Sequence, residues 1–195
     1  MVALVAVGMA AHSLGVLAAG GDYLADSAAV GVSLLAIALS RRRTARRPRG
    51  HPKATAIAAL VNGAFLLVLV TFVIVEALHR LAAGVGEVHG FPVLVVSVIA
   101  AAVMILGAVI IKGDVDEEDD DEGDAANMRA VLLDTIADAA AAAGVAVTGA
   151  IIAVTGHLYW LDPLVALLIA LVVAYHAIVL VRHVVATLRR PSRLS

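Results

Sequence analysis

Asp22-Tyr-Leu-Ala-Asp26 is the stretch that decides how this chain folds, and Asp134-Thr-Ile-Ala-Asp138 repeats its pattern. Both stretches interrupt sequence that is otherwise almost entirely small and aliphatic. Residues four apart lie on one face of an α-helix, so each stretch presents its two carboxylates in the same direction. An Asp near the centre of a membrane helix costs roughly 2.5–3.5 kcal/mol. Four such residues need compensation, and a shared bound cation is the simplest source of it.

The composition indicates an all-α, polytopic membrane protein. The chain has 195 residues, is 62% hydrophobic and has a mean hydropathy of +1.00, whereas a soluble domain is only about half apolar. It contains no cysteine, which excludes disulfides and thiolate metal sites. The ligands that remain for a metal ion are carboxylates and seven histidines.

The apolar stretches predict one transmembrane domain over residues 1–190, a six-helix bundle with an incomplete first helix. If a turn falls at His12-Ser13, the helix before it spans about 17 Å, against a hydrocarbon core of about 30 Å. We therefore expect the chain to begin inside its first helix. Residues 191–195 are expected to form a cytoplasmic tail with no soluble C-terminal domain after it. The helices are expected at residues 1–12, 17–40, 54–81, 91–111, 126–155 and 163–188.

Charge is strongly segregated along the chain. Seven of the fourteen basic residues lie in 41–53, and nine of the sixteen acidic residues lie in 114–124. Basic loops between membrane spans stay in the cytoplasm, and helix parity then places the acidic run and both termini on that side. We expect residues 114–124 to be a solvated, disordered linker, which could also raise the local cation concentration. Nothing in this distribution indicates nucleic acid binding.

The two Asp pairs are placed to meet inside the membrane. The second and fifth predicted helices are antiparallel, with Asp22 about nine residues into one and Asp134 about eight residues into the other. About 20 residues cross the core, so both pairs reach its middle from opposite sides. The sequence thus predicts that Asp22, Asp26, Asp134 and Asp138 bind one divalent metal ion.

Other interpretations of these residues stay open at this point. Asp22 follows two glycines and could be an N-cap at the membrane surface. The carboxylates could also serve a proton pathway without metal. His51, in the basic loop, is either simply solvated or a secondary metal site that gathers ions at the cytoplasmic mouth. The other six histidines are interpreted as interfacial or packing residues.

Four segments, in this order, resemble the cation diffusion facilitators over roughly residues 12–190. They are Ser13-Leu14 with Leu17-Ala18-Ala19 and Asp22/Asp26; Gly50-His51-Pro52-Lys53 with Ala58-Ala59-Leu60-Val61-Asn62; Asn127-Met128-Arg129-Ala130 with Asp134/Asp138; and Asp162-Pro163 with Leu167-Leu168-Ile169-Ala170. The resemblance implies a non-enzymatic, six-helix and usually dimeric transporter. Such proteins export divalent metal in exchange for protons and hold no prosthetic group. The alternatives are a passive cation channel and a non-transporting membrane partner.

The resemblance also implies a range of transported metals, the Zn, Mn, Fe, Co or Cd class, and a location in the bacterial plasma membrane. Many zinc-transporting relatives have His at the first position of one or both metal motifs, where this chain has Asp22 and Asp134. Four carboxylates offer only oxygen, which favours harder ions. We therefore expect a broad divalent exporter with relaxed discrimination against Mn²⁺. The family's usual C-terminal domain, through which members dimerise, is expected to be absent here.

Overall fold

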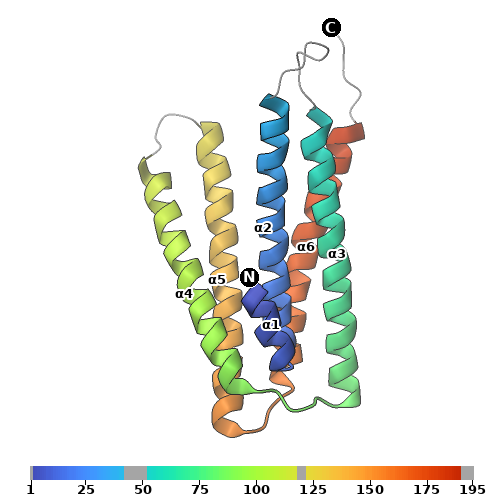
Figure 1. Cartoon of the computed structure of the whole chain (residues 1–195), viewed down its shortest axis with the longest axis vertical. Helices are drawn as coiled ribbons and strands as arrows, with labels where there is room; N and C mark the ends of the chain where they lie inside the picture. The colour runs from blue at the N-terminus through green and yellow to red at the C-terminus, as the bar shows by residue number, and fades with distance from the viewer. Residues whose placement is uncertain (1, 42–51, 118–121, 190–195) are drawn as a thin grey trace.

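The computed structural model describes residues 2–41, 52–117 and 122–189. Within these ranges the side chains of 33–41, 52–59, 114–117, 122–127, 130 and 187–189 are not described. The described chain forms six helices and no strand (Figure 1), which confirms the all-α prediction. His51, most of the basic loop and the predicted tail at 191–195 lie outside the described residues. The helices are α1 (Val2–Ala10), α2 (Leu14–Arg41), α3 (Pro52–Ala83), α4 (Gly90–Glu117), α5 (Glu122–Thr155) and α6 (Leu161–Arg189).

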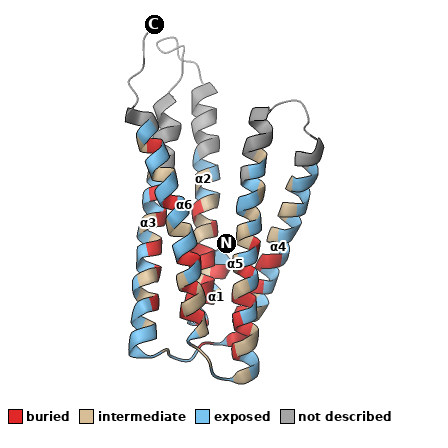
Figure 2. Cartoon of the chain, turned by 180° about the vertical axis from the view of Figure 1, so that it is seen from behind, coloured by how far each residue is buried: buried red, intermediate tan, exposed pale blue. Residues whose placement is uncertain are grey.

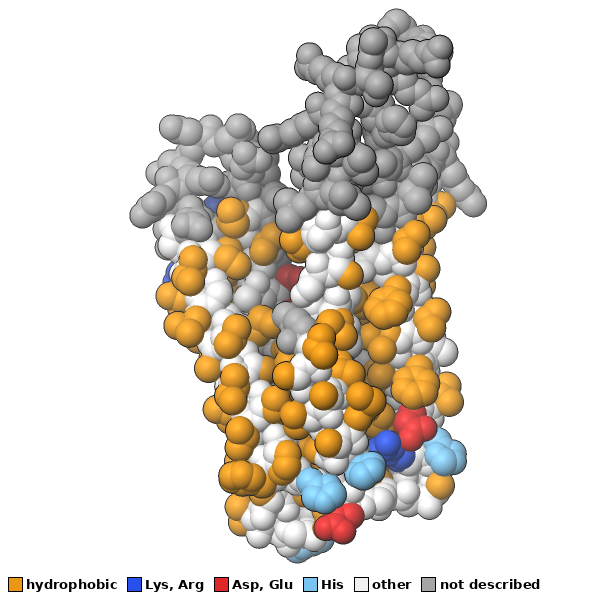
Figure 3. All heavy atoms as spheres, in the orientation of Figure 1, with side chains coloured by type: hydrophobic (Ala, Val, Ile, Leu, Met, Phe, Trp, Pro, Cys, Tyr) orange, Lys and Arg blue, Asp and Glu red, His pale blue; other side chains and the backbone are white. Residues whose placement is uncertain are grey.

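Four stretches of the described helices are long and apolar enough to cross a membrane. They are Leu60–Ala83, Gly90–Gly113, Val131–Thr155 and Leu161–Ala186. Large hydrophobic side chains such as Phe65, Phe72 and Val154 are exposed. Hydrophobic side chains cover much of the outer surface of the bundle in Figure 3, where lipid would cover them. The protein is therefore an integral membrane protein. Helix α1 has 9 residues and spans only about 14 Å.

The largest differences from the expected helix bounds lie on either side of the acidic run. We predicted a linker over residues 114–124, but α4 continues to Glu117 and α5 already begins at Glu122. The prediction is wrong for those flanking residues, and 118–121 lie outside the description. The physical reason is that loss of apolar residues ends a membrane span without ending a helix, because the hydrogen bond from each N–H to the carbonyl four residues earlier does not require an apolar surrounding. Helix α3 begins at Pro52, a first-turn position where proline needs no N–H donor.

The helices pack as two groups (Figures 1 and 2). Helix α4 packs chiefly on α5, whereas α3 packs chiefly on α6, and α2 lies against both α3 and α6. The α4–α5 contact is very close: a Cβ on Gly149 would lie 2.6 Å from the backbone nitrogen of Leu94. Only glycine permits that approach, as is common where membrane helices pack tightly.

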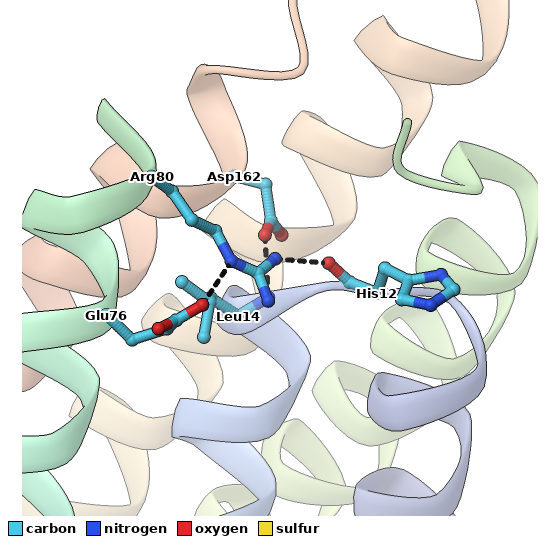
Figure 4. Close-up of polar contacts among 5 residues, drawn as sticks. All are labelled: His12, Leu14, Glu76, Arg80 and Asp162. Atoms are coloured by element: carbon cyan, nitrogen blue, oxygen red, sulfur yellow. Dashed lines mark hydrogen bonds and ion pairs between the residues drawn. The ribbon is translucent and has the colours of Figure 1, made fainter. Parts of the chain in front are cut away.

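We call the end of the bundle that carries the connections 11–13, 84–89 and 156–160 the turn end. At this end α6 holds the start of α2 (Figure 4). The fully buried carboxylate of Asp162 accepts hydrogen bonds from the Ser13 hydroxyl at 2.5 Å and from the backbone N–H of Leu14 at 2.6 Å. The Ser13 hydroxyl oxygen in turn accepts the N–H of Val16 at 3.2 Å, so Ser13 is the N-cap of α2. Asp22 is therefore not an N-cap, and it lies inside the helix.

Candidate metal-binding site

Three of the four predicted carboxylates come together between α2 and α5. One carboxylate oxygen from each of Asp22, Asp26 and Asp138 lies within 4.8 Å of the other two, and all three residues are partly buried. Asp22 and Asp26 share one face of α2 because they are four residues apart. Small side-chain movements would place one oxygen of each residue at about 2.0–2.2 Å from a shared ion, the distance at which carboxylates coordinate Zn²⁺.

Asp134 lies outside this group of three. It is exposed, and it lies one helical turn from Asp138, about 6 Å further from the turn end along α5. It nevertheless lines the same cavity as the other three carboxylates. The geometry therefore brings together three of the predicted ligands, and coordination of one ion by all four stays a prediction.

Tyr23 joins the two helices at the level of the site. Its side chain is 2% exposed, and its hydroxyl donates a hydrogen bond of 3.0 Å to the main-chain carbonyl of Asp138. On another face of α2, the fully buried Ala25 packs against Leu66 of α3 and Ala177 of α6. This small side chain lets α3 and α6 approach α2 closely next to Asp26.

The carboxylates face a cavity of about 880 Å³ between α2, α3, α5 and α6. Figure 3 shows acidic side-chain atoms recessed in a hollow of the surface. No Lys or Arg is among the residues that line the cavity in the described part of the chain. Mutual repulsion of the carboxylates is therefore relieved by a bound cation or by protons. The lining residues are Asp22, Asp26, Asn62, Leu66, Leu133, Asp134, Ala137, Asp138, Ala140, Ala141, Gly144, Val165, Leu168, Ile169, Val172, Val173, His176, Ala177 and Leu180.

Two polar residues of this cavity were missed by the sequence interpretation. Asn62 of α3 and His176 of α6 line it together with the four Asp residues. The sequence carried a signal for both, because a single polar or ionisable residue inside an apolar span is a functional candidate by default. His176 adds an imidazole to the cavity lining, outside the group of three carboxylates whose oxygens lie within 4.8 Å of one another.

The described helices thus form a membrane-spanning bundle around a largely apolar cavity that carries four carboxylates. The chain belongs to the cation efflux family, because the family model of the cation efflux transmembrane domain matches residues 1–188. This confirms the resemblance seen in the sequence. The family consists of transporters rather than enzymes.

Three relatives illustrate the match. The zinc transporter ZitB of Yersinia pestis is 31% identical over 166 residues, which are 84% of this chain and 50% of that protein. ZitB of Pectobacterium atrosepticum is 30% identical over 171 residues, 87% of this chain and 51% of that protein. The cadmium, cobalt and zinc/H(+)-K(+) antiporter of Bacillus velezensis is 29% identical over 182 residues, 91% of this chain and 56% of that protein. The chain thus spans about half the length of the curated relatives it matches.

Proposed function

We propose that this protein exports divalent metal cations, of the Zn, Mn, Fe, Co or Cd class, from the cytoplasm in exchange for protons. The observation that carries the proposal is the group formed by Asp22, Asp26 and Asp138, whose oxygens lie within 4.8 Å of one another beside the cavity. Membership of the cation efflux family and the names of the relatives support it. Antiport with protons is supported by the name of the Bacillus relative.

Proton exchange follows from the choice of ligands. A carboxylate either coordinates the metal as an anion or carries a proton, so metal and protons compete for the same oxygens. No cationic side chain lines the cavity in the described residues to neutralise the carboxylates by itself. Release of the metal therefore leaves the three carboxylates to take up protons, and binding of the next metal ion displaces those protons.

Movement between the two sides of the membrane follows from the packing. The site is shared between α2, which packs on α3 and α6, and α5, which packs chiefly on α4. Rocking of the α4–α5 pair against α2, α3 and α6 would change the access to the carboxylates. The contacts within each of these two groups of helices would stay intact. The fixed site with moving helices is a common transporter arrangement.

We further propose that the protein works as a homodimer in the bacterial plasma membrane with both termini in the cytoplasm. The bacterial origin of the relatives supports the location, and the basic residues of 41–53 support the orientation. The range of metals is proposed to be broad, because the cavity combines several carboxylates with the imidazole of His176. Carboxylates favour Mn²⁺ and imidazole favours Zn²⁺.

The test uses purified protein in liposomes that contain a metal-sensitive dye and, separately, a pH-sensitive dye. We expect Zn²⁺ and Mn²⁺ uptake that is accompanied by proton movement in the opposite direction. Metal flux with no proton movement would support the passive channel instead. No metal flux for any of the five metals would contradict transport by this chain.

A further inference from the structure

Two histidine rings lie side by side at the turn end, away from the carboxylate cavity. The ring centres of His12 and His89 are 6.1 Å apart and the ring planes are inclined at 31°. His12 belongs to the turn between α1 and α2, and His89 directly precedes α4. Both side chains are exposed. The pair therefore joins two connections that are 77 positions apart in the chain.

The backbones of both histidines are held in place. The N–H of His89 donates to the carbonyl of Ala11 at 3.1 Å, directly beside His12. The carbonyl of His12 accepts a hydrogen bond of 2.7 Å from the Nη1 of Arg80 (Figure 4). Next along the chain, the N–H of Ser13 donates to Gly8 at 3.0 Å, and the Ser13 hydroxyl donates to Asp162. These contacts fix the spacing of the two Cα atoms while leaving both rings free to rotate.

His12 also has an unusual backbone conformation. Its φ angle is 57°, in the left-handed region that few residues other than glycine adopt. This conformation ends α1, because the N–H of Ser13 bonds to the Gly8 carbonyl as in a Schellman C-cap. The turn leaves the exposed ring of His12 with its centre 6.1 Å from that of the His89 ring.

The separation of the rings suits a shared metal ion. With Zn–N bonds of about 2.0–2.1 Å, each ring centre lies roughly 3 Å from the ion, so two rings on one tetrahedral ion are about 5–6 Å apart. The observed 6.1 Å reaches that range by a small rotation of either exposed ring. Water would complete the coordination. Imidazole favours zinc, copper, nickel and cobalt over manganese.

The charges nearby permit a cation. Arg80 is the positive group, and it is paired with Glu76 at 2.9 Å. The buried carboxylate of Asp162 lies beside the same guanidinium in Figure 4, and it accepts hydrogen bonds from Ser13, Leu14 and Gly15. The positive charge of Arg80 beneath His12 is matched by Glu76, so this network has no excess positive charge to repel a divalent ion.

We propose that His12 and His89 form a second divalent-cation site, selective for Zn²⁺, Cu²⁺, Ni²⁺ or Co²⁺ over Mn²⁺. The site is separate from the carboxylate cavity and does not depend on whether that cavity transports metal. An ion bound here links the α1–α2 turn to the connection that leads into α4. Because α4 packs on α5, the ion also links the two helix groups at this end of the bundle.

The experiment uses the full chain in detergent micelles with Asp26→Asn, Asp138→Asn and His176→Gln, which disable the cavity. Cu²⁺ bound to this triple variant is examined by electron paramagnetic resonance and by electron spin echo envelope modulation, which together count the coordinated imidazoles. Zn²⁺ and Mn²⁺ binding is measured by calorimetry. We expect one bound Cu²⁺ with two imidazoles, Zn²⁺ binding, and Mn²⁺ binding at least about tenfold weaker, as the ligand type demands.

Single variants then assign the ligands. His12→Asn keeps a residue that tolerates the left-handed backbone, and His89→Gln keeps a polar side chain. Each should lower the count from two imidazoles to one and weaken Zn²⁺ binding about tenfold or more. His79→Gln, an exposed histidine near the end of α3, is the matched control and should leave both values unchanged. Two imidazoles that persist in either variant, or an equal loss in the His79 control, would overturn the proposal.

Discussion

The hydroxyl of Tyr23 donates a 3.0 Å hydrogen bond to the main-chain carbonyl of Asp138. This bond crosses from α2 to α5 at the level where Asp22, Asp26 and Asp138 converge. A buried hydroxyl that contacts the backbone of a site residue, rather than its carboxylate, positions that residue without competing for the metal. It thereby sets the relative placement of the two helices that supply the proposed ligands.

Tyr23→Phe should weaken metal binding while leaving the protein folded. A hydrogen bond of this kind contributes about 0.5–1.5 kcal/mol, so we expect a loss of about two- to tenfold in affinity. Calorimetric titration of purified protein with Zn²⁺ measures it. Tyr159→Phe is the matched control, because that hydroxyl donates to the Gly156 carbonyl at the turn end. Equal weakening in both variants would mean that Tyr23 has no positioning role.

Asp26→Asn and Asp138→Asn should each abolish metal-dependent proton exchange in liposomes. Each substitution removes one of the three converging carboxylates and its negative charge. Asp134→Asn should have a smaller effect, because Asp134 is exposed and lies outside the group. Binding by the unchanged protein should also weaken as the pH falls, since protons compete for the carboxylates. Full exchange in the Asp26 or Asp138 variant would contradict the proposed site.

His176→Gln should shift the metal preference from Zn²⁺ towards Mn²⁺. The variant removes the imidazole that lines the cavity and leaves the carboxylates in place. We expect the ratio of Zn²⁺ to Mn²⁺ affinity to fall on the order of tenfold. This is the lower end of the loss in metal affinity that follows removal of a residue supporting a metal ligand. Competition binding at equal free concentrations measures the ratio. His79→Gln should not change it, and an unchanged ratio in His176→Gln would exclude a role in selection.

Asp162→Ala should destabilise the bundle without removing any cavity residue. It leaves the Ser13 hydroxyl and the N–H groups of Leu14 and Gly15 without their buried acceptor, at a cost of about 1–3 kcal/mol in the free energy of unfolding. Thermal unfolding in detergent checks this as a lower melting temperature. Thr71→Ala, which removes an exposed hydroxyl bonded to the Leu67 carbonyl, should change it little.

A cysteine at position 118 should react with a membrane-impermeant thiol reagent only from the cytoplasmic side. The expectation rests on the basic residues of 41–53 and on helix parity. The chain has no native cysteine, so the label reports this position alone. Labelling of intact cells from outside would reverse the proposed topology, and with it the direction of transport.

The sequence by itself determined the helices and the chemical character of the site. Long apolar stretches cross a membrane only as helices, because every backbone polar group must be paired within the segment. The spacing of Asp22 and Asp26 placed both carboxylates on one face, because helical periodicity is local. The turn near His12 followed from the same local reasoning, and α2 begins at Leu14.

Only the tertiary structure decided which side chains meet. The rotation and height of α5 relative to α2 place Asp138 in the group with Asp22 and Asp26, and leave Asp134 on the lining of the same cavity, one helical turn away. The same holds for His176, which reaches the cavity through the placement of α6, and for Asp162, which caps a helix 148 positions away. These relations depend on how separate helices pack, and the periodicity of a single helix carries no information on that.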